Sequence, residues 1–293
     1  MTLNSLSSAL PTLSLIMAAT LWGLLWLPLR ALDGAGLNGL WTTVIAYASA
    51  MVVALPWLRR WGPVMVRHPG YYIALALASG WCNLAFILAM LEGAVVRVLI
   101  LFYLSPIWTV LFGFVLLGER PSRAAAAVLV TALSGAAMML WSPAIGVPWP
   151  QGAGDWLAIS SGVAFALANV LVRRGRGLPS AGAKMTAAWR GCMTLALAGL
   201  AVSAPALPAT VSAAAVAGAV ALGAIGLVVA TLSVQYGVTH LPVHRSAVIL
   251  LFEVLVGAVS AELWTDEVLH LHEWLGAVLI VTAAWLAARA PHT

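Results

Sequence analysis

Apolar segments long enough to cross a bilayer recur along the whole of this 293-residue chain. A helix needs about 20 apolar residues to span the hydrocarbon of a membrane. Charged residues make up only 8% of the chain, whereas a soluble domain carries about 25%. The sequence therefore predicts an all-α polytopic membrane protein with ten transmembrane helices. The predicted helices are Thr12–Leu32, Leu40–Leu58, Tyr71–Leu91, Val95–Leu117, Ala124–Trp141, Asp155–Val172, Ala183–Ala204, Ala213–Thr239, Val243–Trp264 and Trp274–Ala288.

The positions of the basic residues predict how these helices are oriented. With the N-terminus inside, most of the 14 Lys and Arg residues fall in cytoplasmic loops, and only Arg30 and Arg97 fall outside. Excess Lys and Arg in short loops marks the cytoplasmic side, so both termini are expected there. The basic residues form no patch, so we predict no nucleic-acid partner. The first apolar run lacks a basic n-region, and we interpret it as a retained helix.

The two halves of the chain repeat one outline. The segment Val95–Arg120 recurs as Val243–Glu267, and Ile16–Arg30 recurs as Ile159–Arg173. We therefore predict two repeats, residues 1–142 and 143–293. Each holds five helices, an odd number, so the second copy enters the membrane from the opposite face as an inverted-topology repeat. Aligned pairs are Arg97 with Arg245, Ser105 with Glu253, Pro106 with Val254, Glu119 with Glu267, Trp22 with Phe165, and Trp26 with Asn169.

Glu253 is the most informative polar residue in the chain. It lies near the middle of the predicted helix Val243–Trp264, where a carboxylate costs roughly 2.5 kcal/mol or more and must face a cavity or a partner. One interpretation is a proton-coupling site, and another is a contact for the amine of a substrate. The alternative is a structural Glu that is hydrogen-bonded between helices.

The fourth predicted helix carries the matching polar face. Ser105, Trp108 and Thr109 follow the i, i+3, i+4 spacing, which presents two hydroxyls beside an indole. Pro106 removes a backbone donor and frees a carbonyl that a cavity could satisfy. The alternative is a tolerated proline kink with Trp108 facing lipid.

Aromatic and amide side chains on other helices complete the predicted binding site. Trp22 and Trp26 are i, i+4 neighbours and are expected to form an aromatic wall suited to apolar or cationic groups. The amides suit an ammonium and a carboxylate but could equally join helices. The predicted substrate-binding residues are Trp22, Trp26, Asn83, Ser105, Trp108, Phe165, Asn169, Gln235 and Glu253.

Arg190 lies inside the seventh predicted helix. It is expected either to extend to the cytoplasmic surface or, together with the kink at Pro106, to serve gating, in which case it could pair with Glu253.

No phosphate loop, paired metal ligands or nucleophile motif occurs, so we predict no catalytic residue, no metal and no cofactor. A membrane-embedded enzyme and a channel are the alternatives from other classes. The densest cluster of groups suited to catalysis lies on the outer side, and we interpret it as a solvated helix cap. It contains Asp266, Glu267, His270, His272 and Glu273.

Several short motifs resemble the EamA family of the drug/metabolite transporter superfamily. They are Trp22-Gly23, Pro106 midway through the fourth helix, and Leu117-Gly118-Glu119-Arg120 at its end, together with the two five-helix halves. In place of the Glu-Pro usual in the ninth helix of the family, this chain has Glu253-Val254. The resemblance therefore does not imply a kink at that position.

The resemblance implies a secondary transporter that exports small organic metabolites across a bacterial inner membrane by alternating access. Amino acids, including apolar and aromatic ones, are the leading substrate class, and a multidrug or cationic-compound exporter of the same fold is the alternative. The expected partners are the solute, the lipid bilayer and, if transport is coupled, protons. The protein is expected to act as a monomer.

Overall fold

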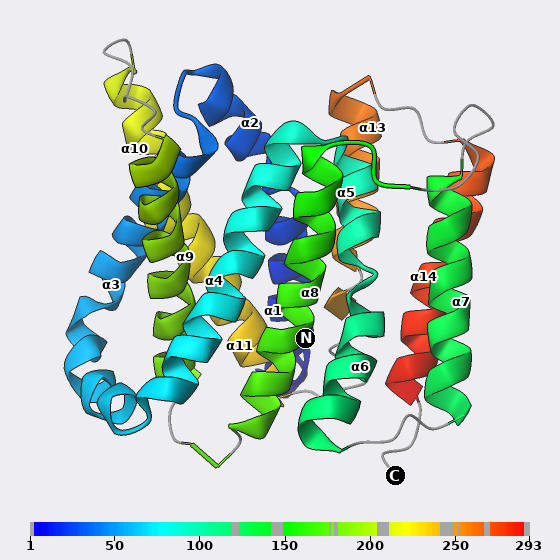
Figure 1. The fold of residues 1–293 in the computed structure, drawn as a ribbon, viewed down its shortest axis with the longest axis horizontal. Coiled ribbons are helices and arrows are strands. Elements are labelled where there is room, and N and C mark those ends of the chain that lie inside the picture. The colour runs from blue at the N-terminus through cyan, green and yellow to red at the C-terminus, as the bar shows by residue number, and fades with distance from the viewer. Residues whose placement is uncertain are drawn as a thin grey trace.

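A computed structural model describes residues 3–118, 123–141, 149–175, 177–178, 181–203, 211–240, 249–250, 252–266 and 270–289. Within these ranges every regular element is a helix, which confirms the all-helical prediction (Figure 1). The helices of the first half are α1 Leu3–Gly23, α2 Trp26–Gly34, α3 Gly39–Arg67, α4 Pro69–Glu92, α5 Val95–Phe102, α6 Ser105–Leu117 and α7 Arg123–Leu140. Those of the second half are α8 Ala153–Arg174, α9 Ala181–Ser203, α10 Ala213–Ala221, the π-helix η1 Leu222–Leu227, α11 Val228–His240, α13 Phe252–Trp264 and α14 Leu271–Arg289.

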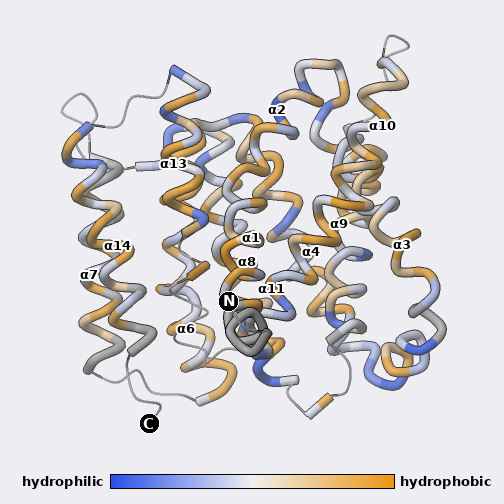
Figure 2. The backbone as a smooth tube through the Cα atoms, turned by 180° about the vertical axis from the view of Figure 1, so that it is seen from behind, coloured by the Kyte–Doolittle hydropathy of each residue, from blue (hydrophilic) through white to orange (hydrophobic). Residues whose placement is uncertain are grey.

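Seven helical segments in the described part of the chain are long and apolar enough to cross a membrane. Two shorter apolar helical segments occur at Ala126–Gly135 and Leu271–Ala283. Hydrophobic residues dominate the lengths of the helices, and most hydrophilic residues gather toward their ends (Figure 2). The seven spans are Leu10–Gly34, Gly39–Pro56, Pro69–Glu92, Val95–Leu117, Ala153–Arg174, Gly182–Ser203 and Ala213–Gly237.

Two spans are interrupted where a proline follows in the next turn. The first span breaks between Gly23 and Trp26, although its sequence predicted one continuous helix. Pro28 explains the break for two reasons. Its ring clashes with the carbonyl of the residue four positions earlier, and it has no backbone N–H to donate to that carbonyl. The fourth span breaks in the same way between Phe102 and Ser105, just before Pro106, as the sequence predicted.

The carbonyl freed by the second break lies against a glycine. Phe102, four residues before Pro106, has its carbonyl oxygen 2.7 Å from where a Cβ on Gly162 would stand. A residue with a side chain at Gly162 would therefore collide with this carbonyl. The contact brings α8 close to the interruption between α5 and α6.

Proline does not always end a helix in this chain. The sequence predicted a break around Arg59–Pro63, yet α3 continues through Pro56 and Pro63 to Arg67. The carbonyl that Pro63 frees is the one of Arg59, beyond the Gly39–Pro56 span, where water at the membrane surface can satisfy it.

The span Ala213–Gly237 contains a π-helical turn that packs against α3. The Ser49 hydroxyl on α3 lies 2.8 Å from the carbonyl oxygen of Ala46 in its own helix and 3.1 Å from that of Val220, just before η1 begins. Gly223 in η1 leaves no room for a Cβ, because one would overlap the carbonyl of Ala46 and the Ser49 hydroxyl. A π-turn disturbs the regular carbonyl pairing of a helix. The single hydroxyl proton of Ser49 is shared between the Ala46 and Val220 carbonyls at that point.

The main contacts between the two halves are symmetric. When the two halves are exchanged, each contact has a counterpart or corresponds to itself. Here the helices are numbered as the ten predicted from the sequence, so that the first corresponds to the sixth and the fifth to the tenth. The contact of α4 with α8 (third with sixth) then has its counterpart in α1 with α11 (eighth with first). Likewise α4 with α9 maps onto η1 with α3, and α6 with α8 maps onto α13 with α1. Three pairs map onto themselves: α3 with α9, α5 with α13, and α7 with α14, which stand side by side in Figure 1.

The closest approach of α1 and α13 is made through two glycines. A Cβ on Gly23 would lie 2.7 Å from the carbonyl oxygen of Glu253 and 3.0 Å from the Cβ of Val256. One turn along α13, Gly257 leaves room for the side chain of Leu99 on α5. Small residues let membrane helices pack at short distance. This crossing fixes where α13 lies relative to α5.

We expect Gly23→Ala to destabilise the protein by about 1–3 kcal/mol, because the added methyl group overpacks this crossing. Chemical unfolding in mixed detergent micelles would measure the loss. Gly34→Ala is the matched control, since a Cβ there meets nothing within 4 Å. Equal stability of the two variants would contradict the close crossing.

Candidate functional site

The most deeply buried short helix leads directly into the site. Every residue of α5 is buried except Arg97. After Phe102 the chain leaves the helical path for two residues, Tyr103 and Leu104, before α6 begins. The side chains at this interruption are therefore held in the middle of the bundle by a helix packed on all sides.

Tyr103 and Glu253 form a hydrogen bond between the two halves of the chain. The Tyr103 hydroxyl donates to the Glu253 carboxylate over 3.1 Å. Glu253 lies in the first turn of α13 and is half-buried. A carboxylate at this depth needs such a donor, because burying it without one is costly. Tyr103 was not predicted from the sequence, although its position three residues before Pro106 places a phenol at the expected break.

Four aromatic rings surround this interruption. The ring of Phe102 lies 5.0 Å from that of Phe86, 5.5 Å from that of Tyr103 and 5.2 Å from that of Phe165. These separations are typical of favourable aromatic pairs. Phe165 is 38% exposed, whereas Phe86 and Phe102 are buried. The cluster joins α4, α5 and α8.

Trp26 is part of a structural network rather than an open wall. It is only 3% exposed, and its Nε1 donates to the hydroxyl of Ser260 on α13 over 3.0 Å. The guanidinium carbon of Arg30 stands 5.3 Å from the centre of the Trp26 ring. Arg30 also donates to the carbonyls of Met90 (3.1 Å) and Gly93 (2.6 Å) at the end of α4. The network ties α2, α4 and α13 together.

Trp22 and Trp26 are not neighbours on one helix face, because the chain breaks between them. Trp22 lies in the last turn of α1, is half-buried and lines a cavity on the side of η1 and α11. The i, i+4 pairing predicted from the sequence requires a continuous helix, and the interruption after Gly23 removes it.

The residues predicted to form a polar face on the fourth helix all lie in α6. Ser105 is buried, and its carbonyl accepts a hydrogen bond from the Thr109 hydroxyl over 3.0 Å. Trp108 is half-buried. Pro106 stands in the first turn of α6. Backbone N–H groups in the first turn have no partner within the helix, so the N–H that proline lacks costs α6 no hydrogen bond.

The three predicted amides differ in their surroundings. Asn83 is half-buried and donates to the carbonyl of Ser79 in its own helix over 2.8 Å. Asn169 is exposed, and Gln235 is half-buried. The hydrogen bond of Asn83 thus lies within α4.

Arg190 is exposed on α9, and the bond of Glu253 goes to Tyr103 instead. His270 and His272 lie near the start of α14, where the Glu273 carboxylate accepts from the His270 backbone N–H over 2.7 Å. This bond is the helix-capping arrangement expected for that cluster. Several residues named in the predictions lie outside the described residues, namely Glu119, Arg120, Ala204, Val243, Arg245 and Glu267.

A partly buried ion pair joins the two halves away from this site. Arg97 near the start of α5 contacts Asp155 near the start of α8 through Nε (2.9 Å) and Nη2 (2.8 Å). Asp155 also accepts from the Gln151 backbone N–H over 2.8 Å, and Arg97 donates to the Trp149 carbonyl over 3.2 Å. The Asp155 side chain is 6% exposed. Such two-point pairing fixes orientation as well as distance.

The chain was compared with known proteins. A model of the EamA-like transporter family matches residues 10–141 and again residues 152–289. No curated protein matches the chain. A solved crystal structure of a protein with 20% sequence identity has the same fold, with a TM-score of 0.63, over 94% of this chain and 96% of the other. The family match covers nearly the whole sequence, and the chain therefore belongs to the EamA-like transporter family.

Proposed function

We propose that this transporter exports small organic metabolites across a bacterial inner membrane by alternating access. Amino acids, apolar and aromatic ones in particular, are the proposed substrates. In this proposal ten helices form two inverted repeats, residues 1–142 and 143–293, with both termini in the cytoplasm. The protein acts as a monomer, because the repeat supplies the second half of the site within one chain.

The symmetric pattern of contacts between the halves supports the inverted repeat. Each main contact between the halves has a counterpart or maps onto itself when the halves are exchanged. A twofold axis between the repeats produces such a pattern, and five helices per repeat make the two copies antiparallel in the membrane.

The observation that carries the proposal is the Tyr103–Glu253 pair beside the aromatic cluster. The carboxylate can receive the ammonium group of an amino acid, and the phenol keeps it oriented. The Phe165 ring, 38% exposed, offers an apolar surface for a side chain. Because Tyr103 belongs to the first half and Glu253 to the second, a solute bound between them would respond to rocking of the halves.

Cationic compounds are the second candidate class, and the same site favours them for a different reason. A carboxylate beside aromatic rings attracts a cation through both its charge and the ring faces. Amino acids also need a donor for their carboxylate group, whereas cationic compounds do not. Competition between an amino acid and its decarboxylated amine therefore separates the two candidates.

A substrate panel in proteoliposomes tests the proposal. We expect saturable uptake of apolar and aromatic amino acids, measured with and without a pH gradient. Saturable flux of cations without any amino-acid flux would replace the first candidate by the second. Ohmic single-channel currents without saturation would reject a transporter mechanism.

We expect Phe165→Ala to weaken transport of bulky apolar solutes by about two- to tenfold, the value of one aromatic contact. Transport of glycine or alanine should change little. KM values for phenylalanine and alanine in proteoliposomes measure the difference. Phe114→Ala is the control, since Phe114 is 51% exposed on α6. Equal losses for both solutes would reject the role of Phe165 as a wall for the side chain.

A further inference from the structure

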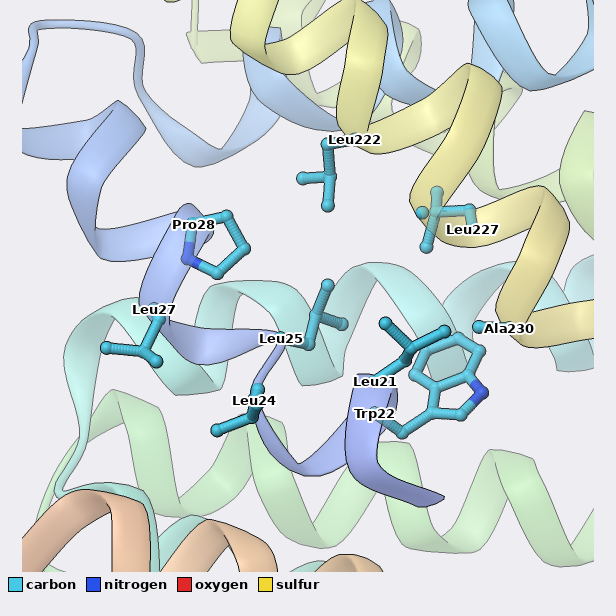
Figure 3. A pocket seen from close by; sticks show the side chains of 10 residues that line it. Leu21, Trp22, Leu24, Leu25, Leu27, Pro28, Leu222, Leu227 and Ala230 are labelled. Carbon is cyan, nitrogen blue, oxygen red and sulfur yellow. The ribbon is translucent and has the colours of Figure 1, made fainter. Parts of the chain in front are cut away.

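A cavity of about 200 Å³ lies between the broken first span and the π-helical part of the eighth (Figure 3). One wall comes from the end of α1 and the start of α2, including Trp22, Leu25 and Pro28. The opposite wall comes from η1 and α11, including Leu227 and Ala230. Both walls are thus built where a membrane helix departs from regular geometry.

The cavity lies midway along the two spans that wall it. Trp22 is the middle residue of the span Leu10–Gly34, and Ile225 in η1 is the middle residue of Ala213–Gly237. The cavity is also separate from the proposed solute site. Tyr103 and Glu253 are not among its lining residues, and it is Gly23, not Trp22, that packs on the backbone of Glu253.

The lining determines what can occupy the cavity. Apart from the Trp22 indole, every lining side chain is aliphatic or absent, and none carries a charge. A buried water needs two to four polar partners, and among the lining side chains only the Trp22 indole N–H can hydrogen-bond. An apolar cavity of roughly 150 Å³ stays dry and accepts benzene. A volume of about 200 Å³ therefore suits one aromatic ring or a short branched alkyl group.

The rear of the π-helical wall is fixed by contacts that do not involve a ligand. Ser49 holds the Val220 carbonyl, and Gly223 packs directly on the backbone of α3. On the other wall, Pro28 keeps the chain out of regular helix. The walls are therefore preformed, as ligand pockets usually are.

We propose that this cavity binds one uncharged apolar group about the size of an aromatic ring. The proposal does not depend on what the protein transports. The group can belong to a solute or to a bilayer lipid, and the chemistry of recognition is the same for both: dry contact with aliphatic walls and the face of Trp22.

Photolabelling of the full chain in nanodiscs with 3-trifluoromethyl-3-phenyldiazirine tests the site, with labelled residues identified by mass spectrometry. We expect saturable labelling of the lining residues. Ala230→Phe places a ring inside the cavity and should reduce saturable labelling about tenfold or more, the change that 1.4 kcal/mol of binding produces. Ile225→Phe is the matched control, because Ile225 lies in η1 of the same span and is 63% exposed.

Gly226→Val is a second filling variant for the case that Ala230→Phe does not fold. A Cβ on Gly226 would lie 3.3 Å from Leu222 Cδ1, the movable end of a side chain. Labelling that rises linearly with probe concentration, equally in the native protein and all variants, would overturn the proposal.

Two further arms identify the source of the group. Displacement of the label by excess phenylalanine would assign the cavity to a solute. Loss of one bound lipid from the filled variants in native mass spectrometry would assign it to an acyl chain. Either result supports the site, and the first alone ties it to transport.

Discussion

Glu253→Gln is expected to reduce transport of amino acids by about tenfold or more, because a hydrogen bond to a charged group contributes 1.5–3 kcal/mol. The amide keeps the size of the side chain and can still accept from Tyr103, so the protein should remain folded. It cannot carry a negative charge to meet an ammonium group, nor can it take up a proton. Uptake by Glu253→Gln should therefore also lose its dependence on pH.

Initial rates of uptake in proteoliposomes, measured from about pH 5.5 to about pH 8.5, would show both effects. Glu262→Gln is the control, because Glu262 is exposed on the same helix α13. Tyr103→Phe should give a smaller loss, since it removes the phenol but leaves the charge. Native rates and a native pH profile in Glu253→Gln would remove the carboxylate from the mechanism.

Arg97→Ala is expected to destabilise the protein by about 3–5 kcal/mol, the cost of leaving a buried ionic partner alone. The variant leaves Asp155, with its side chain 6% exposed, holding only the Gln151 N–H. Equilibrium unfolding in mixed detergent micelles would measure the loss. Arg67→Ala is the control, because Arg67 is exposed at the end of α3.

The double variant Arg97→Ala/Asp155→Ala sharpens this test. If the two groups act as a pair, the double variant should lose less unfolding free energy than the two single variants lose together. The difference is the coupling energy. Strict additivity would mean that the 2.8 Å contact contributes no net stability. We expect the coupling to be large because the pair joins α5 to α8 across the two halves.

The helical class and the family resemblance could be predicted from the sequence because they depend on local properties. Runs of apolar residues leave the backbone no partner in lipid except itself, so helices follow from composition and length. The break before Pro106 was predicted because proline acts on its own helix. Glu253 was recognised for a similar reason, since a charge in an apolar run is costly wherever the helix lies.

Other parts of the site could not be predicted, because they depend on contacts between distant residues. Tyr103 gains its role only from Glu253, 150 residues away, and Asp155 only from Arg97. The aromatic wall expected from Trp22 and Trp26 is divided by the interruption after Gly23, and Trp26 bonds Ser260 instead. Periodicity along one helix describes which residues share a face, but not what that face meets.

By itself the sequence determined that this chain is helical, lies in a membrane, carries a related outline in each half and has a carboxylate within the ninth predicted span. These properties follow from the free energy of placing residues in hydrocarbon, which depends for each segment only on its own residues. Only the tertiary structure decided that Tyr103 meets Glu253, that Phe102 and Phe165 form the adjoining wall, and that an apolar cavity separates α1 from η1. Those contacts depend on how the helices cross, and crossing is set by packing between segments far apart in the chain.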